Sequence, residues 1–422
     1  MSATKAVILA AGKSTRMITD TPKVLHGVCG RPMLAYVLDA CREAGVSELI
    51  VVVGYRKEEV LAAFKDEPGI TWVTQTEDRH GTGHALMCCR EALRGFRGNC
   101  LVLCGDGPLI RSEVISQLLS KHTQERATAT LATARLDDPT SLGRIIRDEY
   151  SNFQGIVEHS DCTAEQLRIT EINPSYYCFD TQQLFDALEQ VRPDNKKHEY
   201  YLTDTLSLML RAGHKVVAIT AVKPGDVLSI NSRHDLAAVG NVMKHRILDH
   251  LMDSGVTVVD PDNTYIDARA KIGQDTIVHP FTYISGRVTI GRNCSVGPFT
   301  YLRDGTVLDD DVVLGVFTEV KKSTLRSGSR VRHLSYIGDA QIGRHVNIGA
   351  GTITANFDGV KVSQTVIGDN TYVASGSILV APLHVPSNSR IAPGSVVNSK
   401  NNKPLVNPDG TPTKSQAKQG ST

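Results

Sequence analysis

Residues 265–320, YIDARAKIGQDTIVHPFTYISGRVTIGRNCSVGPFTYLRDGTVLDDDVVLGVFTEV, decide the fold of the second half of the chain. One aliphatic residue recurs there at every sixth position: Ile266, Ile272, Val278, Ile284, Ile290, Val296, Leu302, Leu308, Leu314 and Val320. Helices repeat every 3.6 residues and strands every two, so neither period fits. Short strands that each form one side of a triangular coil do fit, because the inward residue then returns every six positions. The stretch predicts a solenoid.

A second run of the same period follows downstream: Ile367, Val373, Leu379, Val385, Ile391 and Val397. Between the runs, around residues 326–356, the phase is lost, and this part contains AGTITANFDG. We expect it to be a loop or distorted coil that leaves the stack. The polar tail over 401–422 carries Pro404, Pro408 and Pro412 and no aromatic residue, so it is predicted to be poorly ordered.

Upstream of the repeats, the apolar spacing over 233–255 predicts one long helix that connects two domains. The preceding residues alternate apolar, β-branched runs with helical patterns. Strands are predicted at 6–9, 49–53, 71–74, 101–103 and 127–131, and helices at 32–44, 57–64, 83–93 and 112–121. Such alternation is typical of an α/β domain with a mostly parallel, Rossmann-like sheet. We therefore predict domains at 1–232 and 256–400, joined by the helix.

Composition excludes several kinds of partner and site. The 422 residues contain 46 Lys plus Arg and 45 Asp plus Glu, so no bulk charge draws the chain to nucleic acid or membrane. Its nine cysteines form no CxxC pair, which indicates neither a zinc site nor a disulfide framework. The first residues hold an apolar run too short for a signal peptide, and no apolar run of about 18 residues follows. We expect a cytoplasmic protein.

The first candidate site is LAAGKSTRM (9–17), which follows a predicted strand and precedes PKVL (22–25). Small residues allow backbone N–H groups to approach a phosphate chain, and Arg16 and Lys23 supply positive charge. A Walker A loop would need a glycine five residues before Gly12, where Val7 stands, and no GxGxxG fingerprint is present. From the residues alone this is a phosphate-binding turn of undetermined kind or a strand-to-helix connector.

The order of further motifs is more specific. The turn is followed by GTGHA (81–85), CGD (104–106), GRI (143–145), IVEH (156–159), EIN (171–173), EYYLTD (199–204) and a segment around Asn231. In this order they resemble the N-acetylglucosamine-1-phosphate uridyltransferases, over nearly the whole front half. The resemblance implies Mg²⁺-dependent transfer of a uridylyl group from UTP to N-acetylglucosamine 1-phosphate, with release of pyrophosphate.

The resemblance also implies roles for individual residues. Arg16 and Lys23 are expected to offset charge in the transition state, and Asp106 and Asn231 to hold the magnesium ion. The nucleotide and sugar are expected to be bound by Leu9, Ala10, Ala11, Gly12, Lys23, Gln75, Gly81, Thr82, Cys104, Gly105, Asp106, Gly143, Glu158, Asn173 and Asn231. His84 is expected either to pack beneath its loop or to touch a ligand. Pro174 and Ser175 replace the small pair that usually follows EIN.

Four motifs of the back half, LRDG (302–305), FTEVKK (317–322), HLSYIGDA (333–340) and NIGAGTITANFDG (347–359), resemble the glucosamine-1-phosphate acetyltransferase half of the same bifunctional family. That resemblance implies a left-handed parallel β-helix of hexapeptide repeats and a homotrimer. His333 is expected to be the general base that deprotonates the sugar amine as it attacks acetyl-CoA. Arg303, Lys321, Tyr336 and Asn347 are expected to bind glucosamine 1-phosphate, and acetyl-CoA is expected to be bound by Ala350, Asn356, Phe357, Ser375 and Pro393.

Some positions of the back half depart from the family pattern: Asp304, Val316, Phe357, Pro393 and the segment after Val397. The main hypothesis is a bifunctional enzyme of UDP-N-acetylglucosamine synthesis, which feeds the cell envelope. One alternative keeps only the uridyltransferase, with the β-helix as a trimerisation module. Another is a non-catalytic assembly subunit, against which the intact Arg16, Lys23, Asp106 and Asn231 argue.

Overall fold

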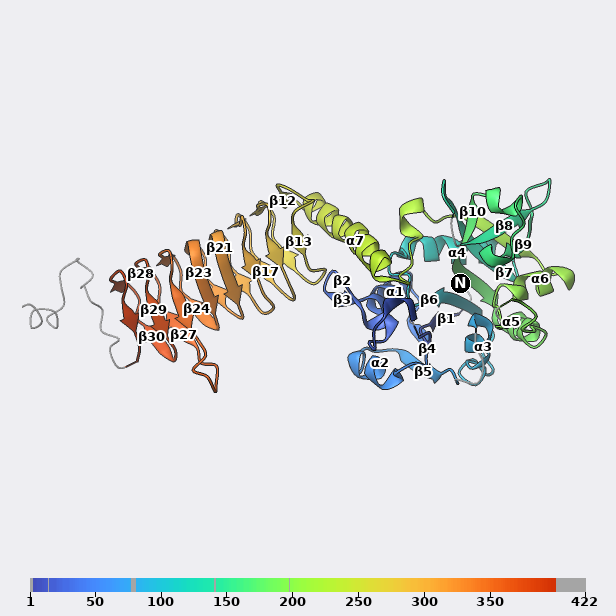
Figure 1. The fold of residues 1–422 in the computed structure, drawn as a ribbon, viewed down its shortest axis with the longest axis horizontal. Helices are drawn as coiled ribbons and strands as arrows, with labels where there is room; N and C mark the ends of the chain where they lie inside the picture. The colour runs from blue at the N-terminus through green and yellow to red at the C-terminus, as the bar shows by residue number, and fades with distance from the viewer. Residues whose placement is uncertain (1–2, 14, 77–80, 140–141, 197, 400–422) are drawn as a thin grey trace, which may run out of the picture. The chain divides into compact units, whose positions relative to one another are not determined.

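The computed structural model describes residues 3–13, 15–76, 81–139, 142–196 and 198–399 (Figure 1). It divides into two compact units, Met1–Gly240 and Asn241–Thr422, and the boundary falls within helix α7 (Arg233–Asp253). The predicted helix over 233–255 is therefore present and ends at Asp253. The predicted tail over 401–422 lies outside the described residues.

A nine-stranded mixed sheet forms the centre of the front unit, in the order β11-β7-β10-β6-β1-β4-β5 with β8 and β9 attached to β10. Strands β1, β4, β5 and β6 are parallel neighbours, whereas β10 runs antiparallel between β6 and β7. Each of the five predicted strands is present. The strand bounds are β1 Thr4–Leu9, β4 Glu48–Val53, β5 Ile70–Thr74, β6 Asn99–Cys104, β7 Ala129–Arg135, β8 Gly143–Arg147, β9 Phe153–Val157, β10 Glu171–Asp180 and β11 Val216–Thr220. A short hairpin, β2 (Gly27–Val28) with β3 (Arg31–Pro32), precedes the first helix.

Helices cover this sheet: α1 Met33–Glu43, α2 Lys57–Ala63, α3 Thr82–Met87, α4 Ser112–Glu125, α5 Thr181–Leu188 and α6 Asp204–Arg211. Apolar side chains of α3, α5 and α6 share one buried cluster with Val7, Val52 and Val102 of the parallel strands. The predicted helix 83–93 is wrong at its end. After Met87 the backbone changes to i→i−3 hydrogen bonds, from Cys89 to Leu86 and from Arg90 to Met87, so the α-helix gives way to turns.

The back unit is a parallel β-helix whose coils have three faces (Figure 1). One face is the ladder β12-β15-β18-β21-β23-β25-β28-β31, the second runs β13-β16-β19-β21-β23-β26-β29-β32, and the third runs β14-β17-β20-β22-β24-β27-β30. The strands are β12 Thr257–Val258, β13 Tyr265–Ile266, β14 Lys271–Ile272, β15 Ile277–Val278, β16 Tyr283–Ile284, β17 Thr289–Ile290, β18 Ser295–Val296, β19 Tyr301–Leu302, β20 Val307–Leu308, β21 Val313–Lys321, β22 Thr324–Leu325, β23 Arg330–Gly338, β24 Ala340–Ile342, β25 Asn347–Ile348, β26 Ile353–Ala355, β27 Thr365–Ile367, β28 Tyr372–Val373, β29 Ile378–Val380, β30 Leu383–Val385, β31 Arg390–Ile391 and β32 Val396–Val397.

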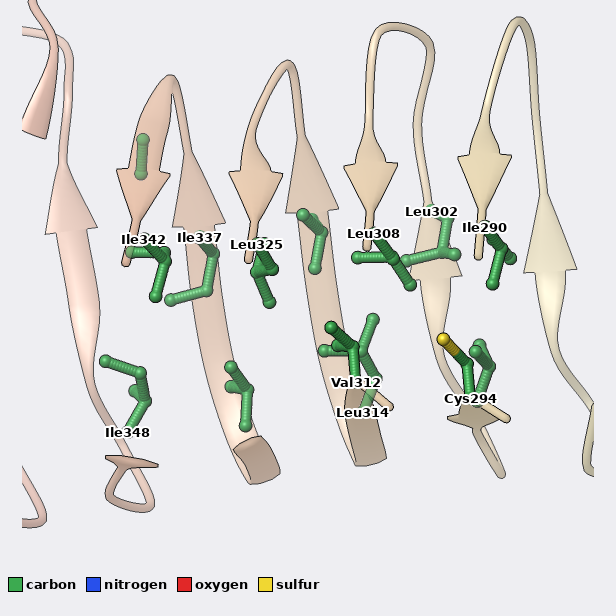
Figure 2. Packing of buried hydrophobic residues seen from close by; sticks show 14 of the residues in the cluster. Ile290, Cys294, Leu302, Leu308, Val312, Leu314, Leu325, Ile337, Ile342 and Ile348 are labelled. Atoms are coloured by element: carbon green, nitrogen blue, oxygen red, sulfur yellow. The ribbon is translucent and has the colours of Figure 1, made fainter. Parts of the chain in front are cut away.

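The sixth-residue aliphatics pack into one continuous core along the inside of these coils (Figure 2). Of the first run, all are buried except Ile272, which is partly buried. Two positions before many of them stands a small hydroxyl residue that bonds the neighbouring coil. Thr276 and Thr300, for example, each donate to a carbonyl one coil on, at 2.9 Å. These bonds satisfy buried polar groups at the corners, where the strands end.

The prediction that residues 326–356 leave the stack is wrong for most of that segment. Leu325, Val331, Ile337, Ile342 and Ile348 continue the same buried core, and strands β22 to β26 stay in their ladders. The phase shifts because two corners are one residue shorter, giving spacings of five before Leu325 and Ile342. The segment that departs from the ladders is the loop 356–364, where Phe357 pairs with Val362.

Among the described residues, no helix combines the length and apolar character that crossing a membrane requires.

Candidate active sites

A pocket of about 870 Å³ opens in the front unit beyond the carboxyl ends of β1, β4 and β6. Parallel sheets place ligands at this edge, because the loops after successive strands meet there. The pocket wall contains Leu9, Ala10, Ala11, Gly12, Lys23, Gln75, Gly81, Thr82, Cys104, Asp106 and Glu158 from the predicted set. Segments that are far apart in the sequence thus converge on a single cavity.

The loop after β1 is held by its neighbours on both sides. Ala10 donates to Val52 O at 2.8 Å, and Gly105 donates to Leu9 O at 2.9 Å. Gly54 lies so close to the loop that an added Cβ would come within 2.8 Å of Ala11 O. The glycine after β4 therefore allows the loop after β1 to approach the sheet edge. Gly105 thus contacts the loop through its backbone and does not line the pocket.

Four polar side chains meet at one end of the pocket. Lys23, on the short helix η2 (Lys23–Leu25), pairs with Asp106 Oδ2 and donates to Asn231 Oδ1 at 2.8 Å. Arg16, on η1 (Thr15–Met17), donates to the same Asn231 oxygen at 2.9 Å. Asp106 and Asn231 are 125 residues apart in the sequence, yet both oxygens contact one ammonium group.

This cluster fits the expected divalent cation. Its Asp106 and Asn231 oxygens already share a positively charged group, the Lys23 ammonium, so they can share a cation. Magnesium keeps several waters and substrate phosphates and needs only one or two protein oxygens. No group of three or more His, Cys, Asp or Glu suited to a metal is found within the described ranges.

Gln75, Gly81 and Thr82, the residues expected to bind the base, form another part of the pocket wall. Gln75 Nε2 donates to Gly81 O at 3.3 Å and lies 3.2 Å from His84 Nδ1. Gly81 has φ +105°, and an added Cβ would be 2.4 Å from Tyr200 O, so only glycine fits. Thr82 Oγ1 accepts from Leu202 N at 3.1 Å, which ties this turn to the EYYLTD segment.

Of the residues expected to bind the sugar, Gly143 and Asn173 are paired residues of β8 and β10. An added Cβ on Gly143 would be 3.5 Å from the Glu158 carboxylate, so these predicted sugar ligands are neighbours. Asn173 Nδ2 donates to Tyr177 Oη at 2.6 Å, and burial raises the pKa of that phenol. Neither Gly143 nor Asn173 reaches the pocket surface, where Glu158 lies. Of the three residues expected to bind the sugar, only Glu158 lines the pocket.

Several pocket residues were missed. Glu199, Tyr201 and Thr203 line the wall, and the EYYLTD motif was the signal that could have assigned them. Burial, followed by the charges of Glu199 and Glu158, raises the pKa of Tyr201 to about 12, so its phenol is protonated near neutrality. Ser175, at φ +68°, also lines the pocket, in a conformation that favours glycine. The pair Pro174–Ser175 therefore preserves the turn after EIN.

On the β-helix, three predicted phosphate and sugar ligands lie on consecutive coils of the second face. Tyr301 is paired with Glu319, and Glu319 with Tyr336. Arg303 stands two residues after Tyr301, and Lys321 stands two residues after Glu319. The two basic side chains therefore occupy equivalent positions on neighbouring coils. Arg303 Nη1 contacts Glu319 Oε1 at 2.9 Å, and that hydrogen bond raises the pKa of the guanidinium. Positive charge and a phenol are thereby gathered on one strip of this face.

The predicted general base and three predicted coenzyme ligands lie at equivalent corner positions of successive coils, which we call the corner column. His333, Ala350, Ser375 and Pro393 each stand two residues after an inward aliphatic residue, and those aliphatics are mutually paired along the first face. Gly376 N donates to Ala350 O at 2.8 Å, and Gly394 N to Ser375 O at 2.9 Å, as stacked corners require. His333 is exposed and paired with Val316. The four residues thus form a continuous edge of the helix.

The remaining back-half candidates lie apart from that column. Asn347, paired with Arg330, belongs to the first face and so lies across the corner from Tyr336. Asn356 and Phe357 follow β26, at its far end from Ala350. Asn356 Nδ2 donates to Asp339 Oδ2 at 2.5 Å, and Phe357 is exposed at the base of the loop 356–364. Within one chain these residues do not meet at a single point.

The departure at Asp304 has a structural explanation. Its Oδ1 accepts from Arg287 N at 2.6 Å, one coil back. An added Cβ on Gly286 would be 2.4 Å from the same oxygen, so aspartate fills the space that the glycine leaves. Asp304 therefore stabilises the turn between coils, which leaves Arg303 to face solvent. Nothing in the structure explains Val316 or Pro393 in place of the usual residues.

Comparisons with known proteins show what the two parts of the chain are similar to. Residues 6–205 match the family described as MobA-like NTP transferase domain, and residues 269–304 match bacterial transferase hexapeptide (six repeats). Among curated relatives, "Bifunctional protein GlmU" of Pelotomaculum thermopropionicum is 42% identical over 411 residues, covering 90% of this chain and 89% of that protein. "Bifunctional protein GlmU" of Clostridium novyi is 40% identical over 428 residues, covering 94% and 93%. A solved UDP-glucose pyrophosphorylase complexed with UDP-glucose has a TM-score of 0.48 and 21% identity, covering 57% of this chain and 98% of that one.

Proposed function

Because the chain belongs to the family of bifunctional GlmU proteins, we propose how its two activities are divided among its residues. The protein is a transferase of UDP-N-acetylglucosamine synthesis. It acetylates glucosamine 1-phosphate with acetyl-CoA, and it joins N-acetylglucosamine 1-phosphate to UTP with release of pyrophosphate. The observation that carries the assignment is the convergence of Arg16, Lys23, Asp106 and Asn231 beside the front-unit pocket.

In the uridyltransferase, the loop from Leu9 to Gly12 binds the triphosphate, Gln75, Gly81 and Thr82 bind uracil, and Glu158 binds the sugar. The sugar-phosphate oxygen attacks the α-phosphorus of UTP in line, forming one P–O bond as the bond to the β-phosphate oxygen breaks. Arg16 and Lys23 stabilise negative charge on the transition state and on departing pyrophosphate. Gly143 lies next to Glu158, and Asn173, its partner on β10, completes the sugar-binding part of the site.

Asp106 and Asn231 are the residues that would hold Mg²⁺. When bound, the ion supplies charge neutralisation for the phosphates. Lys23 contacts both oxygens in this structure, so its ammonium would leave Asp106 for the substrate phosphates. Two oxygens from the protein leave further coordination positions for phosphate and water, as this ion prefers.

In the acetyltransferase, His333 takes a proton from the sugar amine as the amine attacks the thioester carbon. The nitrogen–carbon bond forms, the carbon–sulfur bond breaks, and the coenzyme leaves as a thiol. Arg303 and Lys321 bind the sugar phosphate, and Tyr336 and Asn347 bind the sugar. The Ala350 amide stabilises the oxyanion, and coenzyme A lies along the corner column through Ser375 and Pro393, with Asn356 and Phe357 at its edge.

The chain acts on small molecules, and its hexapeptide β-helix is an oligomerisation module. We assign it a homotrimer in the cytoplasm. Within one chain Asn347 lies across the corner from Arg303 and Lys321, so adjoining subunits would complete the acetyl-transfer site. Ultracentrifugation of the full chain tests the assembly, and a monomer that is fully active in acetyl transfer contradicts it.

Two assays test the division of activities. Purified protein is incubated with glucosamine 1-phosphate and acetyl-CoA while free thiol is followed, with His333→Ala alongside. The same preparations are then supplied with N-acetylglucosamine 1-phosphate, UTP and Mg²⁺. We expect the variant to lose thiol release and to keep formation of UDP-N-acetylglucosamine. Wild-type protein that forms the nucleotide sugar without releasing thiol would instead favour a β-helix that serves trimerisation alone.

A further inference from the structure

His84 lies beneath the base-binding end of the pocket and contacts a residue that lines it. It is buried, on α3, with its ring 6.4 Å from that of Tyr200. Its Nδ1 is 3.2 Å from Gln75 Nε2, and its Nε2 is 3.8 Å from the Cys88 sulfur. Gln75 lines the pocket, whereas His84 does not. The imidazole can therefore act on a ligand through Gln75.

The contacts determine which way the Gln75 amide faces. Its Nε2 lies 3.3 Å from Gly81 O, and only the NH₂ group can pair with a carbonyl oxygen. The same Nε2 also faces His84 Nδ1, so that ring nitrogen must accept. A neutral imidazole that accepts at Nδ1 carries its proton on Nε2. That N–H then points at the Cys88 sulfur.

Both N–H groups of Gln75 are thus used inside the protein. Its Oε1 has no partner within the described parts of the chain, which leaves an acceptor as the polar atom available to the pocket. An unrestrained glutamine could rotate its amide by 180° and offer a donor instead. Two acceptors, Gly81 O and His84 Nδ1, oppose that rotation.

We propose that His84 is a positioning residue that makes the pocket selective for uracil, by locking the Gln75 amide with its oxygen toward the base. This inference rests on the proposed uridyltransferase function. Uracil carries a hydrogen on N3 that Gln75 Oε1 can accept, whereas N3 of cytosine is itself an acceptor. A locked glutamine therefore repels cytosine, and a glutamine free to rotate can accommodate either base. Uracil and cytosine have nearly the same size, so the pocket distinguishes them by whether N3 donates or accepts a hydrogen bond.

The kinetic test compares His84→Phe with His84→Asn. Phenylalanine keeps an aromatic ring but offers no acceptor, whereas asparagine places an oxygen near the position of Nδ1. In His84→Phe we expect the KM for UTP to rise, kcat to change little, and the ratio of kcat/KM for UTP over CTP to fall about fivefold, the effect of one lost hydrogen bond. His84→Asn is expected to restore most of that ratio. N3-methyl-UTP should be a poor substrate of the wild-type protein.

A second measurement does not depend on turnover. Nitrogen-15 NMR of histidine-labelled protein, with the His84 signals assigned by their loss in His84→Asn, reports which ring nitrogen is protonated. We expect the Nε2–H tautomer. The Nδ1–H tautomer, or a folded His84→Phe protein whose selectivity for UTP over CTP is unchanged, overturns the proposal. Absence of UTP turnover in the wild type would instead refute the proposed function, while the NMR result would still decide the tautomer.

Discussion

Lys23 and Asp106 form an ion pair beside the nucleotide pocket, and the same ammonium donates to Asn231 at 2.8 Å. If Asp106 holds the metal ion as proposed, lysine and the metal compete for one carboxylate. The pair keeps Asp106 and Asn231 together before any ligand binds, which reduces the reorganisation that metal binding requires. A metal bound as proposed would have to displace the lysine, and a bound triphosphate would offer the lysine a new partner. Metal and nucleotide binding should therefore reinforce each other.

Replacing Lys23 by methionine tests this competition. With no nucleotide present, we expect Lys23→Met to bind Mn²⁺ several-fold more tightly than the wild type, because the Asp106 carboxylate is no longer paired. Uridylyl transfer should fall at least about 100-fold, since a charge that stabilises the transition state is lost. Electron paramagnetic resonance of free Mn²⁺ gives the affinity directly.

Lys13→Met is the matched control for that experiment. Lys13 also lines the pocket, but its ammonium lies 5.0 Å over the Tyr55 ring. Its removal should leave the affinity for Mn²⁺ unchanged. An equal affinity in Lys23→Met and the wild type would show that the lysine does not compete with the metal.

Gly54→Ala is expected to damage the uridyltransferase alone. The new methyl group would lie 2.8 Å from Ala11 O and displace the loop that binds the triphosphate. We expect kcat/KM for UTP to fall at least about tenfold, because catalysis is sensitive to displacements below 1 Å. Thiol release from acetyl-CoA should be unaffected. Gly225→Ala, with open space around the added Cβ, is the control, and equal losses in the two variants would contradict the prediction.

The back-unit residues should separate binding from chemistry. Arg303→Ala and Lys321→Ala are expected to raise the KM for glucosamine 1-phosphate about tenfold or more, because each removes a charged hydrogen-bond donor to phosphate. His333→Ala should lower kcat for acetyl transfer about 100-fold or more and change KM little. Steady-state kinetics of thiol release measures both. A His333→Ala protein that loses only affinity would assign this residue to binding instead.

Stability of the front unit should decline in mild acid because of His122. This side chain is buried beside Thr130, and burial lowers its pKa from the ordinary 6.5 while Asp180 partly opposes the shift. The unfolded chain therefore binds the proton more readily, so stability is present above pH 6.5 and is lost as the pH falls below it. His122→Gln should reduce the dependence of the free energy of unfolding on pH by up to about 1.4 kcal/mol per pH unit.

Fluorescence of Trp72, the single tryptophan, reports urea unfolding of this unit at pH 7.5, 6.5 and 5.5. The comparison that matters is the pH slope of the wild type against that of His122→Gln, since the other histidines are common to both. If the free energy of unfolding falls equally with pH in the two proteins, His122 is not the cause of the acid destabilisation.

The repeat period predicted the back unit well because each inward residue of a coil contacts only neighbouring coils. Ile284 and Leu302 are paired along one ladder, so the sequence spacing directly sets the three-dimensional spacing. The same rule failed at Leu325 and Ile342, where shorter corners shift the phase without breaking the stack. Aliphatic spacing alone does not distinguish a shorter corner from a segment that leaves the coil.

The sequence by itself determined the alternation of strands and helices up to about residue 131, the solenoid and the family, because local periodicity and short motifs carry that information. Only the tertiary structure decided that Lys23 is shared by Asp106 and Asn231, that His84 contacts Gln75, and that His333 stacks on Ala350. Each of these relationships joins residues from different elements, and their geometry depends on how β1, β4 and β6 pair, or on how the coils stack. Hydrogen bonds between distant segments form only when the packed backbone brings their atoms within about 3 Å, which no local pattern records.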